Sequence, residues 1–199
     1  MKGIPESLNN LISEFSNLPG IGKKTAERLA IYVLKTDKSQ ALPLSDAIIS
    51  VKNQINFHDL CRSFVENGEC VICDDSSRDT KLLCILKDPT DIFIIEKTGY
   101  NGLYHILGGL ISPMDGLGPD KLNFINLFSR LDEFEEVIIA LEPSSEGDAT
   151  SSYIINELQD ANIIVSRLAR GVPVGASFDY VDEVTLTHSL NDRIRINDT

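Results

Sequence analysis

The sequence predicts an α+β protein of several modules: an N-terminal helical hairpin, a small cysteine-bearing finger, an α/β domain with a mainly parallel sheet, and a C-terminal segment. Three observations lead to this fold class. Apolar residues recur at helical spacing near the N-terminus, cysteines gather between residues 58 and 73, and continuous apolar runs then alternate with helix-like stretches. At 199 residues with 42% hydrophobic content, the chain can bury a sizeable core.

The N-terminal part predicts three helices. Residues 6–17 carry apolar side chains at i, i+3, i+4 and i+7, namely Leu8, Leu11, Ile12 and Phe15. Residues 18–22 break this pattern, and a second helix is expected from Lys23 to Leu34. A third is expected from Ser45, acting as its N-cap, to Phe57.

From Leu82 onward the hydrophobic pattern of the sequence changes. Apolar runs at 82–86, 92–95, 137–141 and 163–165 are bounded by turns or polar residues, which is typical of fully buried parallel strands. Helix-like stretches lie near 119–131 and 146–160. The alternation predicts an α/β layer.

Charge is distributed unevenly along the chain. The formal net charge is −12, which argues against a protein that coats nucleic acid over its whole surface. Residues 1–38 contain six Lys/Arg against four Asp/Glu, a local net charge of +2, so the remainder carries −14. A DNA contact is therefore expected in the N-terminal segment. With no apolar run near the roughly 20 residues of a membrane span and no signal-peptide core, a cytoplasmic protein is expected.

The turn between the first two helices has the pattern of a helix-hairpin-helix. Its sequence is Leu-Pro-Gly-Ile-Gly-Lys-Lys-Thr-Ala, residues 18–26. Two glycines allow a tight turn and a close approach to phosphate, and the amides that begin the second helix face the anion. The expected DNA-binding residues are Gly20, Gly22, Lys23, Lys24 and Arg28. Such contacts do not read base sequence, so binding is expected to be non-specific and salt-sensitive. The alternative is a plain helical hairpin.

The four cysteines suggest a metal site. His58-x2-Cys61-x8-Cys70-x2-Cys73 contains two x2 pairs that can close on one tetrahedral Zn²⁺. Cys84 is excluded because it sits in an apolar run, where a free cysteine behaves as a small buried hydrophobe. The expected ligands are therefore His58, Cys61, Cys70 and Cys73, in a closed structural site. The alternative is that His58 is a loop residue and no metal binds.

An acidic stretch follows the run at 137–141. Carboxylates at the C-terminal edge of parallel strands are where α/β folds hold Mg²⁺ or ligands, and Glu142, Glu146 and Asp148 fit that position. The same acids suit the N-terminus of a helix that begins near residue 146. The sequence leaves both interpretations open.

With these motifs in hand, the chain resembles the RecR recombination mediators over roughly residues 5–196. The resemblance rests on the hairpin, the knuckle spacing, and three further blocks at 97–109, 111–119 and 167–175. It implies a Toprim α/β domain, and the expected division is a hairpin module at 1–56, a zinc finger at 57–80, a Toprim domain at 81–175 and a C-terminal segment at 176–199.

The resemblance also implies a function. RecR proteins form a dimer or a ring-like tetramer that encircles DNA, act with RecO and in some lineages RecF, and help to load RecA. They are not enzymes. Carried over by position, Lys23 and Arg28 match the DNA-contacting residues, and Glu146 and Asp148 match the acidic stretch near the RecO contact. The block at 170–175, otherwise a surface loop, is expected to lead into the C-terminal segment that forms oligomers.

Two residues depart from the family pattern. The family normally has Cys at the position of His58. It often has an acid at Lys87, where catalytic Toprim enzymes use a Glu as general acid/base or metal partner. No nucleophile is evident, so the enzymatic interpretation, a Mg²⁺-dependent nuclease or strand-transfer enzyme, is disfavoured.

Overall fold

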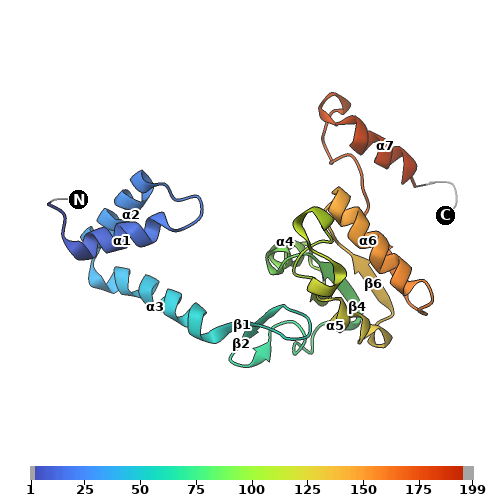
Figure 1. Cartoon of the computed structure of the whole chain (residues 1–199), viewed down its shortest axis with the longest axis horizontal. Coiled ribbons are helices and arrows are strands. Elements are labelled where there is room, and N and C mark those ends of the chain that lie inside the picture. The colour runs from blue at the N-terminus through green and yellow to red at the C-terminus, as the bar shows by residue number, and fades with distance from the viewer. Residues whose placement is uncertain (1–2, 195–199) are drawn as a thin grey trace. The chain divides into compact units, whose positions relative to one another are not determined.

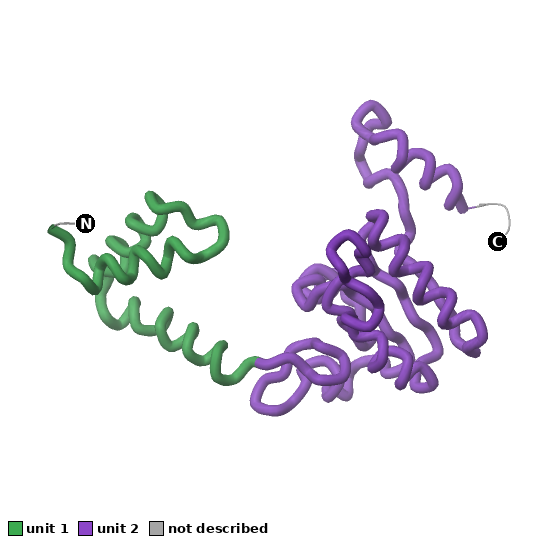
Figure 2. The backbone as a smooth tube through the Cα atoms, in the orientation of Figure 1, with its two compact units in different colours: residues 1–55 green, residues 56–199 purple. Residues whose placement is uncertain are grey.

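The computed structural model describes residues 3–194. The chain divides into two compact units, residues 1–55 and residues 56–199, which Figure 2 colours separately. Each unit has its own core.

The first unit is helical, with α1 Glu6–Ser16, α2 Lys23–Lys35 and α3 Lys38–Gln54 (Figure 1). The bounds of α1 and α2 confirm the two helices predicted from apolar spacing. Ile12, Ala26 and Ala30 are buried between them, and the small alanines let the two helices approach closely. This packing fixes the turn at residues 17–22.

The predicted start of the third helix is wrong. α3 begins at Lys38 after Asp37, not at Ser45, and it ends at Gln54 because Ile55–Phe57 is extended as β1. Pro43 lies in the second turn of α3, beyond the first turn where proline is tolerated, and it has no N–H to donate to the Ser39 carbonyl. None of the α3 residues is buried, and its large apolar side chains are at least half exposed: Leu42, Leu44, Ile48, Ile49 and Val51.

The second unit opens with a small sheet in the order β1-β2-β3. Strands β2, Phe64–Glu66, and β3, Glu69–Cys70, pair antiparallel. Asn67 and Gly68 join them with φ values of 53° and 90°, the left-handed geometry that a tight two-residue hairpin requires. This hairpin carries Cys70 toward the rest of the finger.

A four-stranded parallel sheet forms the main core. Its strands are β4 Asp79–Leu86, β5 Gly102–Ile106, β6 Glu136–Ile139 and β7 Ile164–Arg167, in the order β5-β4-β6-β7. The runs at 82–86, 137–141 and 163–165 are thereby confirmed as strands. β5 was not predicted, because its sequence Gly-Leu-Tyr-His-Ile lies in a glycine-rich block and has no continuous apolar run, yet all five residues are buried.

The run at 92–95 is a helix, so its prediction as a strand is wrong. Asp88 and Asp91 form a capping box around the 3-10 turn Pro89–Asp91, which starts α4, Ile92–Ile95, followed by the 3-10 turn Glu96–Thr98. Ile92 is buried whereas Phe93 and Ile94 are exposed, the one-sided pattern of a surface helix.

Helices complete the second unit. α5 Phe124–Phe128 is much shorter than the predicted 119–131, because Pro119–Lys121 forms a 3-10 turn and Leu122 is extended. α6 Ser145–Leu158 matches its prediction and buries Ile154 and Leu158 in the sheet core. Further 3-10 turns lie at Pro113–Asp115, Leu131–Glu133 and Phe178–Tyr180, and α7 spans Glu183–Asn191. Between residues 3 and 194, no helix has the length and apolarity needed to cross a bilayer.

Candidate functional site

The hairpin turn presents an open helix N-terminus. Gly20 has φ +78°, a left-handed conformation that favours glycine, and it directs the chain from α1 into α2. Gly22, the N-cap of α2, has φ −76°, and a Cβ there would meet no atom within 4 Å. Packing within the chain therefore does not require glycine at position 22, and the backbone there is open to a ligand.

The electrostatics of this N-terminus favour an anion. α2 has no side-chain cap and no acid in its first turn, so the amides of Lys23 and Lys24 are free of the usual local acceptors. Instead the turn carries these two lysines, with Arg28 one turn later, and all three side chains are exposed. Cations at the positive end of a helix dipole repel it, and an external anion relieves that repulsion. The structure thus brings together the five residues predicted to bind DNA.

The predicted metal ligands converge. One ligand atom from each of His58, Cys61, Cys70 and Cys73 lies within 4.8 Å of every other. Cys61 Sγ is 3.7 Å from Cys70 Sγ and 3.4 Å from Cys73 Sγ, and His58 Nδ1 is 3.1 Å from Cys61 Sγ. Sulfurs bound at 2.3 Å to a tetrahedral zinc lie roughly 3.8 Å apart, so the donor set fits a Cys₃His site able to hold a metal ion.

Hydrogen bonds favour the thiolate form of Cys61. The Cys73 thiol donates to Cys61, which lowers the pKa of Cys61 to about 4, with help from the Ser63 hydroxyl 2.8 Å away. The pKa of Cys73 is raised, because it holds the proton that it donates to Cys61. Cys84 lies outside the cluster, and burial raises its pKa to about 12, as expected for an inert core thiol.

The first knuckle is anchored to the parallel sheet. The Ile106 amide donates to the Cys61 carbonyl at 2.8 Å, and the Arg62 guanidinium donates to the Leu107 carbonyl at 3.3 Å. The side-chain amides of Asn123 and Asn126 donate to carbonyls of the same loop, Leu60 and Asp59, each at 2.9 Å. A metal in this cluster would therefore cross-link the finger while the sheet holds the finger in place.

The acidic stretch begins where β6 ends. Ser144 is the N-cap of α6, and its hydroxyl accepts from the Gly147 amide at 3.0 Å. Glu146 and Asp148 lie in the first turn, where the helix dipole stabilises negative charge. Glu142 precedes this turn. A Cβ at buried Gly147 would overlap the Glu142 carbonyl oxygen, so the glycine keeps the loop close to the helix.

Two of these three acids are paired with cations. Lys87 Nζ lies 3.0 Å from Glu142 Oε1, although the two residues are 55 positions apart in the chain. Arg170 forms a bidentate ion pair with Asp148 and lowers the pKa of that carboxyl. Glu146 is exposed on the same turn. The motif at 142–148 could not reveal these partners, because they come from the ends of other strands.

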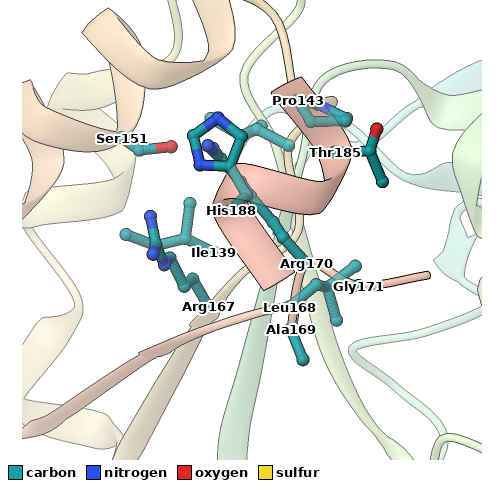
Figure 3. Close-up of a pocket in the computed structure, with 11 residues that line it drawn as sticks. Ile139, Pro143, Ser151, Arg167, Leu168, Ala169, Arg170, Gly171, Thr185 and His188 are labelled. Carbon is teal, nitrogen blue, oxygen red and sulfur yellow. The ribbon is translucent and has the colours of Figure 1, made fainter. Parts of the chain in front are cut away.

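A cavity of about 300 Å³ lies beyond the ends of β6 and β7. Figure 3 shows His188 and Thr185 reaching it from α7 and Arg167 reaching it from β7. Arg167 is bonded to Asp192 at 3.0 and 3.2 Å, so an ion pair fastens the end of α7 to the sheet. Sequence reasoning did not find this contact, and its only signal was the basic block at 167–170.

The fold and the sites define a class of protein that joins a helical hairpin, a Cys/His finger and a Toprim-like parallel sheet. Three family descriptions match the chain, "RecR, helix-hairpin-helix" over residues 8–52, "Toprim domain" over 81–169 and "RecR, C-terminal" over 171–194. The chain belongs to the RecR family of recombination proteins.

Relatives that match this chain over nearly their whole length are named RecR. The chain is 45% identical to "Recombination protein RecR" of Desulforapulum autotrophicum over 192 residues, which covers 95% of this chain and 96% of the relative. It is 45% identical to that of Tropheryma whipplei (strain TW08/27) over 193 residues, with 96% and 98% coverage. For Chlorobium chlorochromatii the identity is 43% over 195 residues, with 94% and 96% coverage. The resemblance read from the motifs is confirmed.

Proposed function

We propose that this protein is a recombination mediator of DNA repair: a non-enzymatic clamp that binds DNA without sequence specificity and acts with RecO, and in some settings RecF, to help load RecA onto single-stranded or gapped DNA. It would work in the cytoplasm, at the nucleoid. Its family membership supports a role in recombination. The remaining steps rest on four groups of residues: the hairpin, the exposed apolar surface, the finger and the acidic edge.

The hairpin is the observation that carries the proposal. An uncapped N-terminus at Gly22, with two lysines and an arginine around it, is a backbone-and-charge site for phosphate. Contacts of this kind go to the phosphate backbone and carry no information on base sequence, so binding through them would be non-specific. This is the recognition that a mediator needs, since it must act on any damaged sequence.

The clamp requires more than one copy of the chain, and exposed apolar surface supports this. The large apolar side chains of α3, and Phe178, Tyr180 and Val184 in and near α7, are all at least half exposed. Apolar residues gathered on helices with little or no burial commonly mark association surfaces. We propose a homo-oligomer, either a dimer or a tetrameric ring, that uses these surfaces.

The finger and the acidic edge have supporting roles in this proposal. One structural Zn²⁺ per chain, bound by His58, Cys61, Cys70 and Cys73, would hold the finger that follows the hairpin module. The acidic edge, Glu142, Glu146 and Asp148, would dock RecO, because an acidic patch attracts a basic partner and disfavours wrong ones. A lysine at position 87 supports the non-enzymatic interpretation.

The test compares two double variants that remove the same charge. Lys23→Ala with Arg28→Ala removes two proposed phosphate contacts, whereas Lys35→Ala with Lys38→Ala removes two exposed charges elsewhere in the first unit. Binding to single-stranded and gapped DNA is followed by fluorescence anisotropy across a salt titration. The first variant should bind weakly, and the slope of log K against log salt should fall by about 1.4 to 1.8. Equal binding by the two variants would show that the hairpin is not the DNA site.

A further inference from the structure

The carboxyl edge of the sheet between β4 and β6 encloses a cavity of about 240 Å³, lined by Lys87, Asp91, Glu142 and Pro143 among others. The two strands run parallel, with Ile85 opposite Ile139, so the residues that follow them meet at this edge. Edges of this kind hold ligands and metal ions in α/β folds. In a Toprim domain the expected occupant is a divalent cation.

The donor set does not fit a divalent cation. A hard cation of this kind needs several free oxygen ligands, mostly carboxylates. Position 87, directly after β4, supplies an ammonium group, and that group is 3.0 Å from Glu142 Oε1. An ion placed between the two strand ends would face a positive charge where a carboxylate is required.

Three neighbouring carboxylates, those of Asp88, Asp91 and Asp148, have other partners. Asp88 accepts from the amide and hydroxyl of Thr90, and Asp91 accepts from the Asp88 amide at 3.0 Å. Asp148 is paired with Arg170. Lys87 and Asp88 thus end β4 with an ion pair and a turn, and Glu146, exposed in the first turn of α6, is the acid of the stretch 142–148 that neither ion pair engages.

We propose that the Lys87 ammonium is the resident cation of this edge, occupying through its ion pair with Glu142 the position that a divalent metal ion takes in catalytic Toprim domains. One tethered charge neutralises Glu142 without any ion from solution. The charge of the edge is then independent of the magnesium concentration. The single residue that excludes the metal is Lys87, so Lys87→Glu restores a divalent site between the ends of β4 and β6.

The strength of the exclusion follows from Coulomb's law. Replacing the ammonium with a carboxylate changes the local charge by two units at a distance of about 4 Å from a divalent ion. Even at the dielectric constant of water, this change exceeds the 1.4 kcal/mol that corresponds to tenfold in affinity. Lys87→Glu should therefore bind Mn²⁺ more than about tenfold more tightly than the parent. This inference concerns the ion at the edge and is independent of whether the edge docks a partner.

The experiment counts bound Mn²⁺ by electron paramagnetic resonance, using the full-length protein with its zinc site loaded. The variants are Lys87→Glu, the same change combined with Glu142→Gln, and the matched control Lys81→Glu, which places the same charge change near the opposite end of β4. We expect one Mn²⁺ per chain for Lys87→Glu, loss of that ion in the double variant, and no gain for Lys81→Glu. Lys87→Met, which removes the charge without adding a ligand, should fall between the parent and Lys87→Glu, and it serves as the readout if Lys87→Glu does not fold.

Two results would overturn the proposal. The first is one Mn²⁺ bound per chain of the parent as tightly as by Lys87→Glu, and lost on Glu142→Gln, because the edge would then be a metal site despite the lysine. The second is an affinity of Lys87→Glu and Lys87→Met no higher than that of Lys81→Glu, because the lysine would then be an ordinary surface ion pair.

Discussion

Replacement of Gly22 with serine should make the protein more stable and less able to bind DNA. Gly22 is the N-cap of α2, and its extended backbone at φ −76° and ψ 161° suits any residue. A serine hydroxyl there would accept from an amide in the first turn, where the native helix has no side-chain cap. The amides it satisfies are the ones proposed to face phosphate.

The sizes of the two effects can be worked out separately. Serine is a better N-cap than glycine by a few tenths of a kcal/mol, and removing a glycine from the unfolded chain adds about 0.4 to 1 kcal/mol. The free energy of unfolding should therefore rise by about 0.6 to 1.4 kcal/mol. A lost hydrogen bond to a charged phosphate costs about 1.5 to 3 kcal/mol, so DNA affinity should fall by about tenfold or more.

The assay combines urea unfolding with anisotropy at several salt concentrations. Gly22→Ser should leave the salt slope unchanged because no cation is removed, whereas Lys23→Ala should lower it by about 0.7 to 0.9. Gly20→Ala is the control for backbone strain, since φ +78° would cost an alanine about 1 to 2 kcal/mol of stability. If Gly22→Ser is more stable yet binds DNA as tightly as the parent, the amides of the hairpin do not contact phosphate.

Further predictions concern the finger and the acidic edge. Elemental analysis should find one zinc per chain, with X-ray absorption reporting three sulfur ligands and one nitrogen. Cys84→Ala should keep the metal and Cys70→Ala should lose it, and zinc retained by the Cys70 variant would disprove the ligand set. Glu146→Lys should weaken RecO binding in a pull-down with purified proteins while DNA binding by the variant stays close to that of the parent. RecO binding that does not change would exclude Glu146 from the docking surface.

The sequence predicted elements whose signal is local. The apolar spacing of α1 and α2 and the buried runs of β4, β6 and β7 reflect a helix face or a doubly covered sheet, so they can be read within a few residues. The run at 92–95 failed for a reason that was also local. The capping box of Asp88 and Asp91 starts a helix, and this signal outweighs an apolar run too short to distinguish strand from helix.

The candidate sites also divide into those whose residues are close in sequence and those that only the sheet brings together. The glycines and lysines of the hairpin and the x2–x8–x2 ligands are close in sequence, and spacing alone brought them together. Lys87 with Glu142, and Arg170 with Asp148, are joined only by the order of strands in the sheet. Side-chain pairs across parallel strands leave no periodic trace, so the charge state of the acidic edge could be learned only from the structure.

The anchoring of the first knuckle has a consequence for how this protein matures. Its partners, Ile106, Leu107, Asn123 and Asn126, lie 45 or more residues downstream, so they leave the ribosome after all four metal ligands have emerged. The four ligands can bind an ion early, but the loop of the first knuckle can form its hydrogen bonds only after β5 and α5 have been synthesised. With the proposed zinc ion, metal binding and closure of the sheet would be successive steps of biosynthesis, and without zinc the finger would not be ordered when the sheet is ready to fold.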